Sequence, residues 1–360
     1  MEFDKLESQA LIGFVEQARD ESENMKKAAA VYKKNSDKIL NLMEEKKLLH
    51  KLDLTKENLD TYSKIFTDAV DGSNQYYQKP DGSFIYFFST ARIRYQSGYT
   101  SKVEVTVTPH TETINEIEEK SASNNAEKIM LSMETETMKR SLMQRNDDGL
   151  LFLDGPIIDP PGRTISSEYL SQRTLSIKDA LNKKIMTIGI VKRVLGDMFT
   201  NKYKNYFDDN DKKLFEQMHS DKNLAIHVLT KYLSSEKNLV AYTEPLIMNN
   251  SIAEKYHNYG VDVLTFIMKN GYHISPIRVD VALPTNNKDD IYKIAEKAIK
   301  HVVAWAAPGR HIPVPVILAH EKCNIGQGAA EILFTEFITG SKTDDNEENI
   351  IQIQMMGEVH

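Results

Sequence analysis

The chain has 360 residues, of which 41% are hydrophobic and 27% are charged, a balance typical of a globular protein with room for one large or two modest domains. Its net charge of −7 excludes a protein that coats nucleic acid by bulk attraction, although a local basic track is compatible with it. The single cysteine, Cys323, excludes an internal disulfide and any zinc site built from several cysteines. No apolar run approaches the roughly 20 residues of a membrane span, and the acidic N-terminus lacks the features of a secretory signal, so we expect a cytoplasmic protein with no membrane partner.

Hydrophobic spacing predicts the elements in chain order. Residues 1–60 place apolar residues at roughly helical intervals among many Lys and Glu, which predicts a helical arm. Beyond the arm, runs rich in β-branched and aromatic residues predict strands. The KPDG sequence over 79–82 predicts a turn that contains Asp81. Strands are expected just before Asp71 and over 84–95, 102–108, 150–153, 185–191, 239–242, 263–268, 277–283 and 314–318; helices are expected over 113–144, 208–233, 288–304 and 329–338.

This order of elements predicts an α/β protein with a mixed sheet of ribonuclease H-like type and flanking helices. The arm over 1–60 is expected to precede a core domain over 61–340, which carries a helical insert at about 205–260. An acidic linker and a short apolar tail follow over 341–360. Acids at the strand ends of such a sheet are where metal ions bind, although the fold alone does not license a function.

Two aspartates follow apolar runs and directly precede a glycine. Asp71 lies in AVDGSN over 69–74, and Asp154 lies in LLFLDGP over 150–156. The apolar residues predict buried strands, the glycine predicts a sharp turn, and each carboxylate is therefore expected at the C-terminal tip of its strand. A lone aspartate before glycine is more often a turn or helix-cap residue. Two such tips side by side, however, give two hard oxygen ligands for a divalent cation.

A third carboxylate is predicted on the helix expected over 113–144. Glu134 is spaced by four residues from both Met130 and Met138, so it lies within the apolar stripe of that helix. A carboxylate there is costly unless it is paired or bound to a metal. Glu136 lies nearer the polar side of the helix, so we choose Glu134 as the third carboxylate and keep Glu136 as the alternative.

Two further polar side chains leave apolar runs. His320 follows VPVILA over 314–319, which we interpret as a buried strand that brings the imidazole to its tip as a metal ligand or as an acid/base near neutral pH. Lys192 follows IGIV over 188–191. It is a candidate to hold a phosphate or to offset charge in a transition state, and a lysine at the start of a helix is the alternative.

Arg278 and Asp280 share one face of the strand expected over 277–283. That face is either solvated or directed at the site, and the two side chains could simply pair with each other. A mixed carboxylate and imidazole set favours Mn²⁺ or Mg²⁺ over softer metals. Two such ions serve an in-line displacement at phosphorus, because one activates water and the other stabilises the leaving oxygen. The residues therefore predict a metal-dependent nuclease.

An ordered set of short motifs resembles the NurA nuclease family over about residues 70–338. The motifs are VDGS at 70–73, a helical Glu, LDGP at 153–156, IGIVK at 188–192, RVD at 278–280 and AH at 319–320. The resemblance implies a ribonuclease H-like core, Mn²⁺-dependent cleavage of DNA as a 5′–3′ exonuclease with single-strand endonuclease activity, and a homodimer. It also implies a hexameric HerA-type translocase as partner in DNA end resection for recombinational repair. Carried over by motif, it implies that Asp71, Glu134, Asp154 and His320 are catalytic and bind metal, and that Lys192 contacts the scissile region.

Two other interpretations compete with the nuclease. An actin- or hexokinase-like phosphotransferase also places Asp-Gly at strand ends, but it requires paired glycine-rich phosphate loops, and only Gly326-Gln327-Gly328 is available. A non-catalytic adaptor for DNA ends or for the translocase would keep the fold without turnover. The two aspartates, the helical glutamate and His320 speak against such an adaptor, and divalent-metal binding would separate it from the nuclease.

Overall fold

The structure, a computed structural model, describes residues 3–55, 58–79, 81–99, 101–116, 118–145, 148–159, 166–194, 196–233 and 239–340. It divides into two compact units, which we call the core unit and the arm unit. The core unit comprises Glu57–Lys192, Pro245–Phe266 and Arg278–His360, and the arm unit comprises Met1–Lys56, Arg193–Glu244 and Ile267–Ile277. The linker and tail predicted over 341–360 lie outside the described residues, and the predicted domain boundaries stay predictions.

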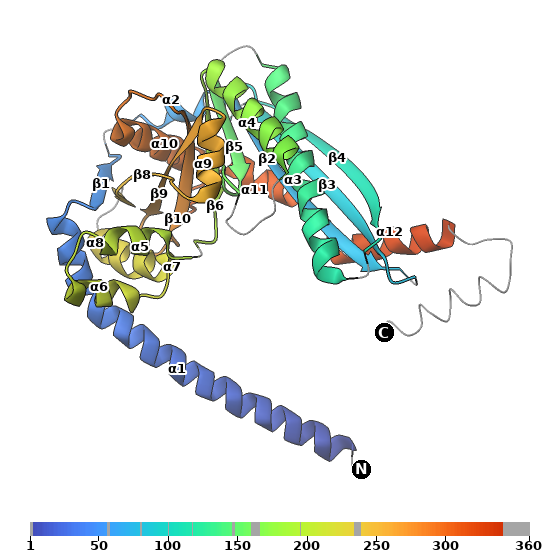
Figure 1. Ribbon diagram of the computed structural model, residues 1–360, viewed down its shortest axis with the longest axis horizontal. Coiled ribbons are helices and arrows are strands. Elements are labelled where there is room, and N and C mark those ends of the chain that lie inside the picture. Colours follow the sequence, from blue (N-terminus) through green and yellow to red (C-terminus); the bar gives the residue numbers. More distant parts are fainter. Residues whose placement is uncertain are drawn as a thin grey trace. The chain divides into compact units, whose positions relative to one another are not determined.

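The core unit is built on a mixed sheet (Figure 1). Its strands follow the order β9-β10-β6-β5-β2-β3-β4, with the short β8 beside β9. Strands β2, β3 and β4 form an antiparallel meander, whereas β5 pairs in parallel with both β2 and β6. The bounds are β2 (Thr67–Gln78), β3 (Phe84–Tyr95), β4 (Val103–Ile114), β5 (Gly149–Asp154), β6 (Ile185–Val191), β8 (Leu246–Ile247), β9 (Val261–Asn270) and β10 (Ile277–Pro284).

Helices cover both faces of this sheet. Successive residues of a strand point to opposite faces, and on β2 Asp71 meets α11 while Gly72 meets α3. The α3 face is sealed by an apolar cluster that includes Met138, Leu153 and Ile177. The core-unit helices are α2 (Asp60–Ser63), α3 (Glu119–Met143), α4 (Ser167–Asn182), α9 (Ser251–Asn258), α10 (Ile291–Trp305), α11 (Val314–Cys323) and α12 (Gln327–Gly340).

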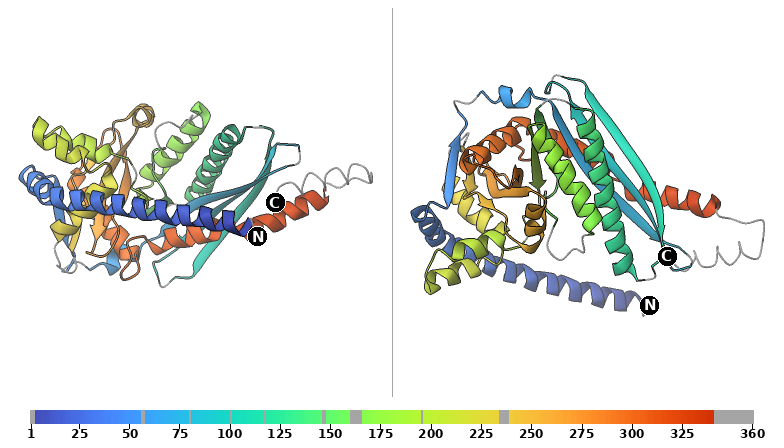
Figure 2. Two further views of the ribbon diagram at one scale, coloured as in Figure 1. Left: turned by 90° about the horizontal axis from the view of Figure 1, so that it is seen from below. Right: turned by 45° about the horizontal axis from the view of Figure 1, so that its top comes forward.

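The arm unit contains the long helix α1 (Phe3–Glu45), which Figure 2 shows from two further sides. Among the α1 residues whose side chains are described (14, 15 and 17–45), the buried ones, such as Ile39 and Met43, lie toward the C-terminal end, whereas Phe14 and Met25 are largely exposed. Strand β1 pairs with β7, and β7 pairs with the last residues of β9. The remaining bounds are β1 (Leu49–Asp53), α5 (Met198–Lys204), α6 (Asp209–Glu216), α7 (Asp221–Leu224), the π-helix η1 (Ala225–Leu229), α8 (Thr230–Leu233) and β7 (Leu239–Thr243).

Three predicted elements differ from the structure. The helical arm predicted over 1–60 ends at Glu45, and strand β1 follows it. The strand predicted over 314–318 is wrong, because these residues begin helix α11. Pro313 is the N-cap of this helix and Pro315 lies in its first turn. Proline is tolerated there because the backbone N–H that it lacks would have no partner within the helix. The helix predicted from 113 begins at Glu119 instead, because β4 runs on to Ile114 beside the full length of β3.

The predicted fold class is otherwise confirmed: a ribonuclease H-like mixed sheet with flanking helices and an N-terminal helix. The strands over 84–95 and 185–191 match β3 and β6. Asp81 lies in a turn, as predicted, and accepts a hydrogen bond from the Ser83 backbone N–H at 2.9 Å. Within the described ranges, no helix is long and apolar enough to cross a membrane.

Candidate metal centre

Asp71 lies within a strand rather than at its tip. The prediction of a turn after Asp71 is wrong, since β2 continues through Gly72 to Gln78 and pairs with β3 along its whole length. The Asp71 side chain is only 7% exposed. Its Oδ1 accepts a hydrogen bond from the Gly72 N–H at 2.8 Å, while its Oδ2 lies 2.9 Å from Nδ1 of His320.

Asp154 is the last residue of β5, as predicted. Gly155 follows with φ of 133°, in the region that favours glycine, and lets the chain leave the sheet. Parallel pairing sets Val70 opposite Leu153, so the next residues of the two strands, Asp71 and Asp154, are neighbours.

His320 reaches the same place from α11. Its Nδ1 lies 3.4 Å from Oδ2 of Asp154 as well as 2.9 Å from Oδ2 of Asp71. The donor atoms of the three residues all lie within 4.8 Å of one another, close enough to share one ion. Two hard carboxylates with one imidazole suit Mn²⁺ or Mg²⁺ better than a thiophilic metal. The His320 side chain is 57% exposed, so the group is open to solvent on that side.

Lys192 stands beside Asp154. It follows β6, and its Nζ lies 2.5 Å from Oδ2 of Asp154. The Lys192 side chain is 27% exposed, against 9% for Asp154. A lysine in this position supplies a positive charge at the edge of the carboxylate group, where it can also meet an anionic substrate.

Glu134 approaches the group from the opposite face of the sheet. It lies on α3, and a Cβ atom built on Gly72 would fall 2.7 Å from its Oε1. Glu134 is therefore held against β2 next to Asp71, although it lies outside the three-residue group of mutually close donors. The predicted third carboxylate thus lies on the α3 side of the sheet, against the residue that follows Asp71.

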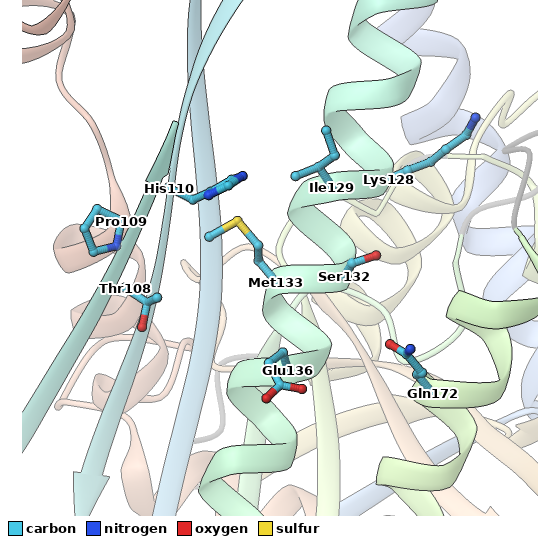
Figure 3. Close-up of a pocket in the computed structure, with 9 residues that line it drawn as sticks. All are labelled: Thr108, Pro109, His110, Lys128, Ile129, Ser132, Met133, Glu136 and Gln172. Atoms are coloured by element: carbon cyan, nitrogen blue, oxygen red, sulfur yellow. The ribbon is translucent and has the colours of Figure 1, made fainter. Parts of the chain in front are cut away.

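Glu136 faces elsewhere. Its carboxylate accepts a hydrogen bond from Nε of Arg140 at 3.1 Å. It also lines an open surface hollow of about 540 Å³ between β4, α3 and α4, as Figure 3 shows together with His110 and Met133. This position separates Glu136 from the carboxylate group and favours Glu134 as the third acid.

The carboxylates are crowded and poorly solvated, which changes their acidity. Burial, and then the charge of Asp154, raises the pKa of Asp71 to about 7. Burial raises the pKa of Glu134 to about 8; Arg173 opposes this rise, and Asp71 and Asp154 add to it. The charge of Asp154 thus makes both Asp71 and Glu134 harder to ionise, and a bound divalent cation would relieve that repulsion.

Arg278 and Asp280 pair with each other, which is one of the alternatives that the sequence left open. Nε of Arg278 lies 3.1 Å from Oδ1 of Asp280, and Thr265 donates to the same oxygen at 2.8 Å. The backbone N–H of Ile157 donates to Oδ2 at 3.4 Å. Asp280 is fully buried, and its contacts tie the loop that follows Asp154 to β10.

Two residues of the site carried no functional signal in the sequence. The buried thiol of Cys323 lies 3.4 Å from Oδ2 of Asp71, and burial followed by the Asp71 charge raises its pKa well above the usual range. Cys323 is three residues after His320, so a helical reading of this segment would have set both on one face. Arg173 is only 3% exposed and interacts electrostatically with Glu134.

Proteins of known structure share the fold of this chain. No curated protein sequence matches the chain. Among solved structures, the NurA nuclease from Sulfolobus solfataricus is similar with a TM-score of 0.60 and 13% identity, over 90% of this chain and 95% of that chain. A NurA bound to dAMP and manganese has a TM-score of 0.41 and 11% identity, over 85% and 95% of the two chains. Endonuclease V from Bacillus subtilis has a TM-score of 0.33 and 15% identity, over 79% and 90%.

The family assignment rests on the sequence model of the NurA domain, which matches residues 67–325. The match covers well over half of the chain and begins and ends around the residues that form the carboxylate and histidine group. The chain belongs to the NurA nuclease family.

Proposed function

We propose that this protein is a metal-dependent deoxyribonuclease whose centre is formed by Asp71, Asp154 and His320. The observation that carries the proposal is the convergence of these three donors within 4.8 Å from two strands and one helix. Membership of the NurA family supplies the reaction class. Mn²⁺ fits this donor set, Mg²⁺ is the alternative ion, and Glu134 offers a carboxylate for a second one.

The residues have distinct roles in this proposal. Asp71 and Asp154 would hold the ion through carboxylate oxygens, and His320 would hold it through the ring nitrogen that faces both acids. The chemistry that bound Mn²⁺ or Mg²⁺ supplies is activation of water and stabilisation of the leaving oxygen in an in-line phosphoryl displacement.

Lys192 orients the substrate. It is ion-paired with Asp154 and half-buried, so it can exchange that contact for a non-bridging oxygen of the scissile phosphate without leaving the site. A cation beside the phosphate offsets charge that builds in the transition state.

The wider role also follows from family membership. We propose a 5′–3′ exonuclease with single-strand endonuclease activity, active as a homodimer and coupled to a HerA-type hexameric translocase in DNA end resection for recombinational repair. Light scattering on the purified chain tests the dimer, and co-purification with a HerA-type ATPase tests the partnership. A monomer at micromolar concentration, or no complex with the ATPase, would remove the corresponding part of the proposal.

Digestion of end-labelled linear DNA, single- and double-stranded, tests the activity. Wild type is compared with Asp71→Ala and Asp154→Ala in Mn²⁺, in Mg²⁺ and in EDTA. Metal-dependent cleavage by the wild type that both variants lose is the expected result. If no cleavage occurs with either metal, even with the translocase present, the non-catalytic adaptor becomes the better assignment.

A further inference from the structure

The glycine after Asp71 has no conformational reason to be a glycine. Its backbone is extended and pairs in register with Thr90 of β3, and such a backbone accepts any residue. The turn that would explain a glycine in this motif is absent, because β2 continues for six further residues to Gln78. The reason must lie in the space that a side chain would occupy.

That space is occupied by Glu134. A Cβ atom on Gly72 would lie 2.7 Å from Oε1 of Glu134, 2.9 Å from its Cγ and 3.2 Å from Cγ of Met130. The first two separations are shorter than ordinary van der Waals contact allows, so a side chain at position 72 and the present position of Glu134 exclude each other.

Two contacts hold helix α3 to the sheet, one on each side of Glu134, and oppose its retreat. On one side, Nδ2 of Asn74 lies 3.3 Å from Sδ of Met130. On the other, the hydroxyl of Thr137 lies 2.9 Å from that of Thr90, the residue paired with Gly72, and both threonines are buried. A new methyl group would therefore displace the Glu134 side chain rather than the helix.

We propose that Gly72 is a positioning residue for the metal centre. Because Gly72 has no side chain, the Glu134 carboxylate can pack against β2 beside Asp71. The inference rests on the proposed function in assigning Glu134 to the centre. Adjacent residues of one strand thus serve opposite faces of the sheet, since Asp71 gives its carboxylate to the His320 side and Gly72 admits a carboxylate from the α3 side.

The test is Gly72→Ala in the full-length protein. We expect normal folding by circular dichroism, because the carboxyl end of Glu134 can rotate away, but a loss of Mn²⁺ affinity of about 10–100-fold, the range typical of residues that orient metal ligands. Cleavage of DNA falls with it. Gly328→Ala is the matched control, since a Cβ on Gly328 meets nothing within 4 Å, and it is expected to behave as wild type.

A double-mutant cycle shows whether Gly72 acts through Glu134. In the Glu134→Ala background, Gly72→Ala is expected to change neither Mn²⁺ affinity nor cleavage further. Wild-type affinity in Gly72→Ala, or an undiminished further loss in the double variant, would overturn the inference.

Thermal unfolding without metal tests the contact between position 72 and Glu134 independently of any nuclease activity. Gly72→Ala is expected to lower Tm in the wild-type background and to lower it less in the Glu134→Ala background, because the crowded carboxylate is then gone. Equal losses in both backgrounds would overturn the inference. A wild type that cleaves no DNA would refute the proposed function instead, and this unfolding cycle would still decide whether Gly72 seats Glu134.

Discussion

Strand β2 carries two buried aspartates, Asp68 and Asp71, whose charged surroundings are opposite in kind. Asp68 is completely buried and meets Arg94 in a two-pronged ion pair, with Nε–Oδ1 at 2.8 Å and NH2–Oδ2 at 3.0 Å. Arg145 adds a second guanidinium at 3.5 Å. Within the part of the chain that the structure describes, no arginine contacts Asp71, which instead faces Asp154, and the charge of Asp154 helps to raise the pKa of Asp71 to about 7. Asp68 is neutralised within the protein, whereas the Asp71 carboxylate is destabilised in the way that the proposed metal centre requires.

The largest expected effect is the loss of protein stability when Asp68 is replaced. Asp68→Asn removes the carboxylate that pairs with the buried Arg94 and lies beside Arg145, so we expect the free energy of unfolding to fall by about 3–5 kcal/mol. Urea denaturation followed by circular dichroism measures this loss. A change below about 1 kcal/mol would show that the ion pair between Asp68 and Arg94 contributes little to stability.

The second prediction concerns Asp71. Asp71→Asn removes a proposed metal ligand and a repelled charge at once, so we expect cleavage to fall by more than about 100-fold, above the range typical of residues that only orient ligands. Stability without metal is expected to be kept or to rise at pH 8, because the uncompensated charge is gone. Single-turnover cleavage and urea denaturation are the two measurements, and a destabilised Asp71→Asn would break the contrast with Asp68.

Lys192 is expected to have a smaller effect. Lys192→Met removes a charged contact worth about 1.5 kcal/mol, which corresponds to roughly a tenfold loss in kcat. Because Asp154 then has no ammonium competitor, Mn²⁺ affinity is expected to hold or to increase. Titration calorimetry and steady-state cleavage separate these two effects. Weakened metal binding would contradict the assignment of Lys192 to the substrate.

The smallest expected effect is a pH-dependent shift in Tm. The pKa values of Asp71 and Glu134 are raised to about 7 and about 8, mainly by burial. Between about pH 4 and pH 8 the folded state therefore holds protons that the unfolded chain has released, so without metal the free energy of unfolding falls as pH rises through that window. We expect the metal-free protein to have a lower Tm at pH 8 than at pH 5.

Added Mn²⁺ sharpens the same measurement. Fewer protons compete with the ion at pH 8 than at pH 6, because the acids have pKa values of about 7 and about 8. The gain in Tm on adding Mn²⁺ is therefore expected to be larger at pH 8, by a few degrees. Asp71→Asn is the control, since it lacks one of the two titrating acids and should reduce the pH dependence. A wild-type Tm that rises with pH in the absence of metal would show the wrong sign.

The sequence predicted the identity of the clustered residues better than their local structure. Asp154 was placed correctly, because a short apolar run before Asp-Gly does end a parallel strand here. The same pattern failed at Asp71. There, pairing with β3 extends β2 beyond the glycine, and the space beside Gly72 is filled by Glu134 from a helix distant in sequence. No local rule reveals a glycine whose reason is a tertiary contact.

His320 was found for the wrong reason. Its apolar, β-branched approach favours a strand by propensity, but burial of α11 against the sheet prevails. Pro313 and Pro315 were the available local signal, since proline is common in the first helical turn. Cys323 and Arg173 lay beyond sequence reasoning because their roles depend on which elements pack together.

The three converging donors come from β2, β5 and α11, which lie far apart along the chain. An ion held by all three would link α11 to the sheet, because α11 could not separate from the sheet without the loss of a metal ligand. Local opening of α11 would then require metal dissociation as well as the loss of its own packing. Amide hydrogens of α11 should accordingly exchange with solvent deuterium more slowly when Mn²⁺ is present, so that the segment bearing His320 reports occupancy of the centre in the absence of any DNA.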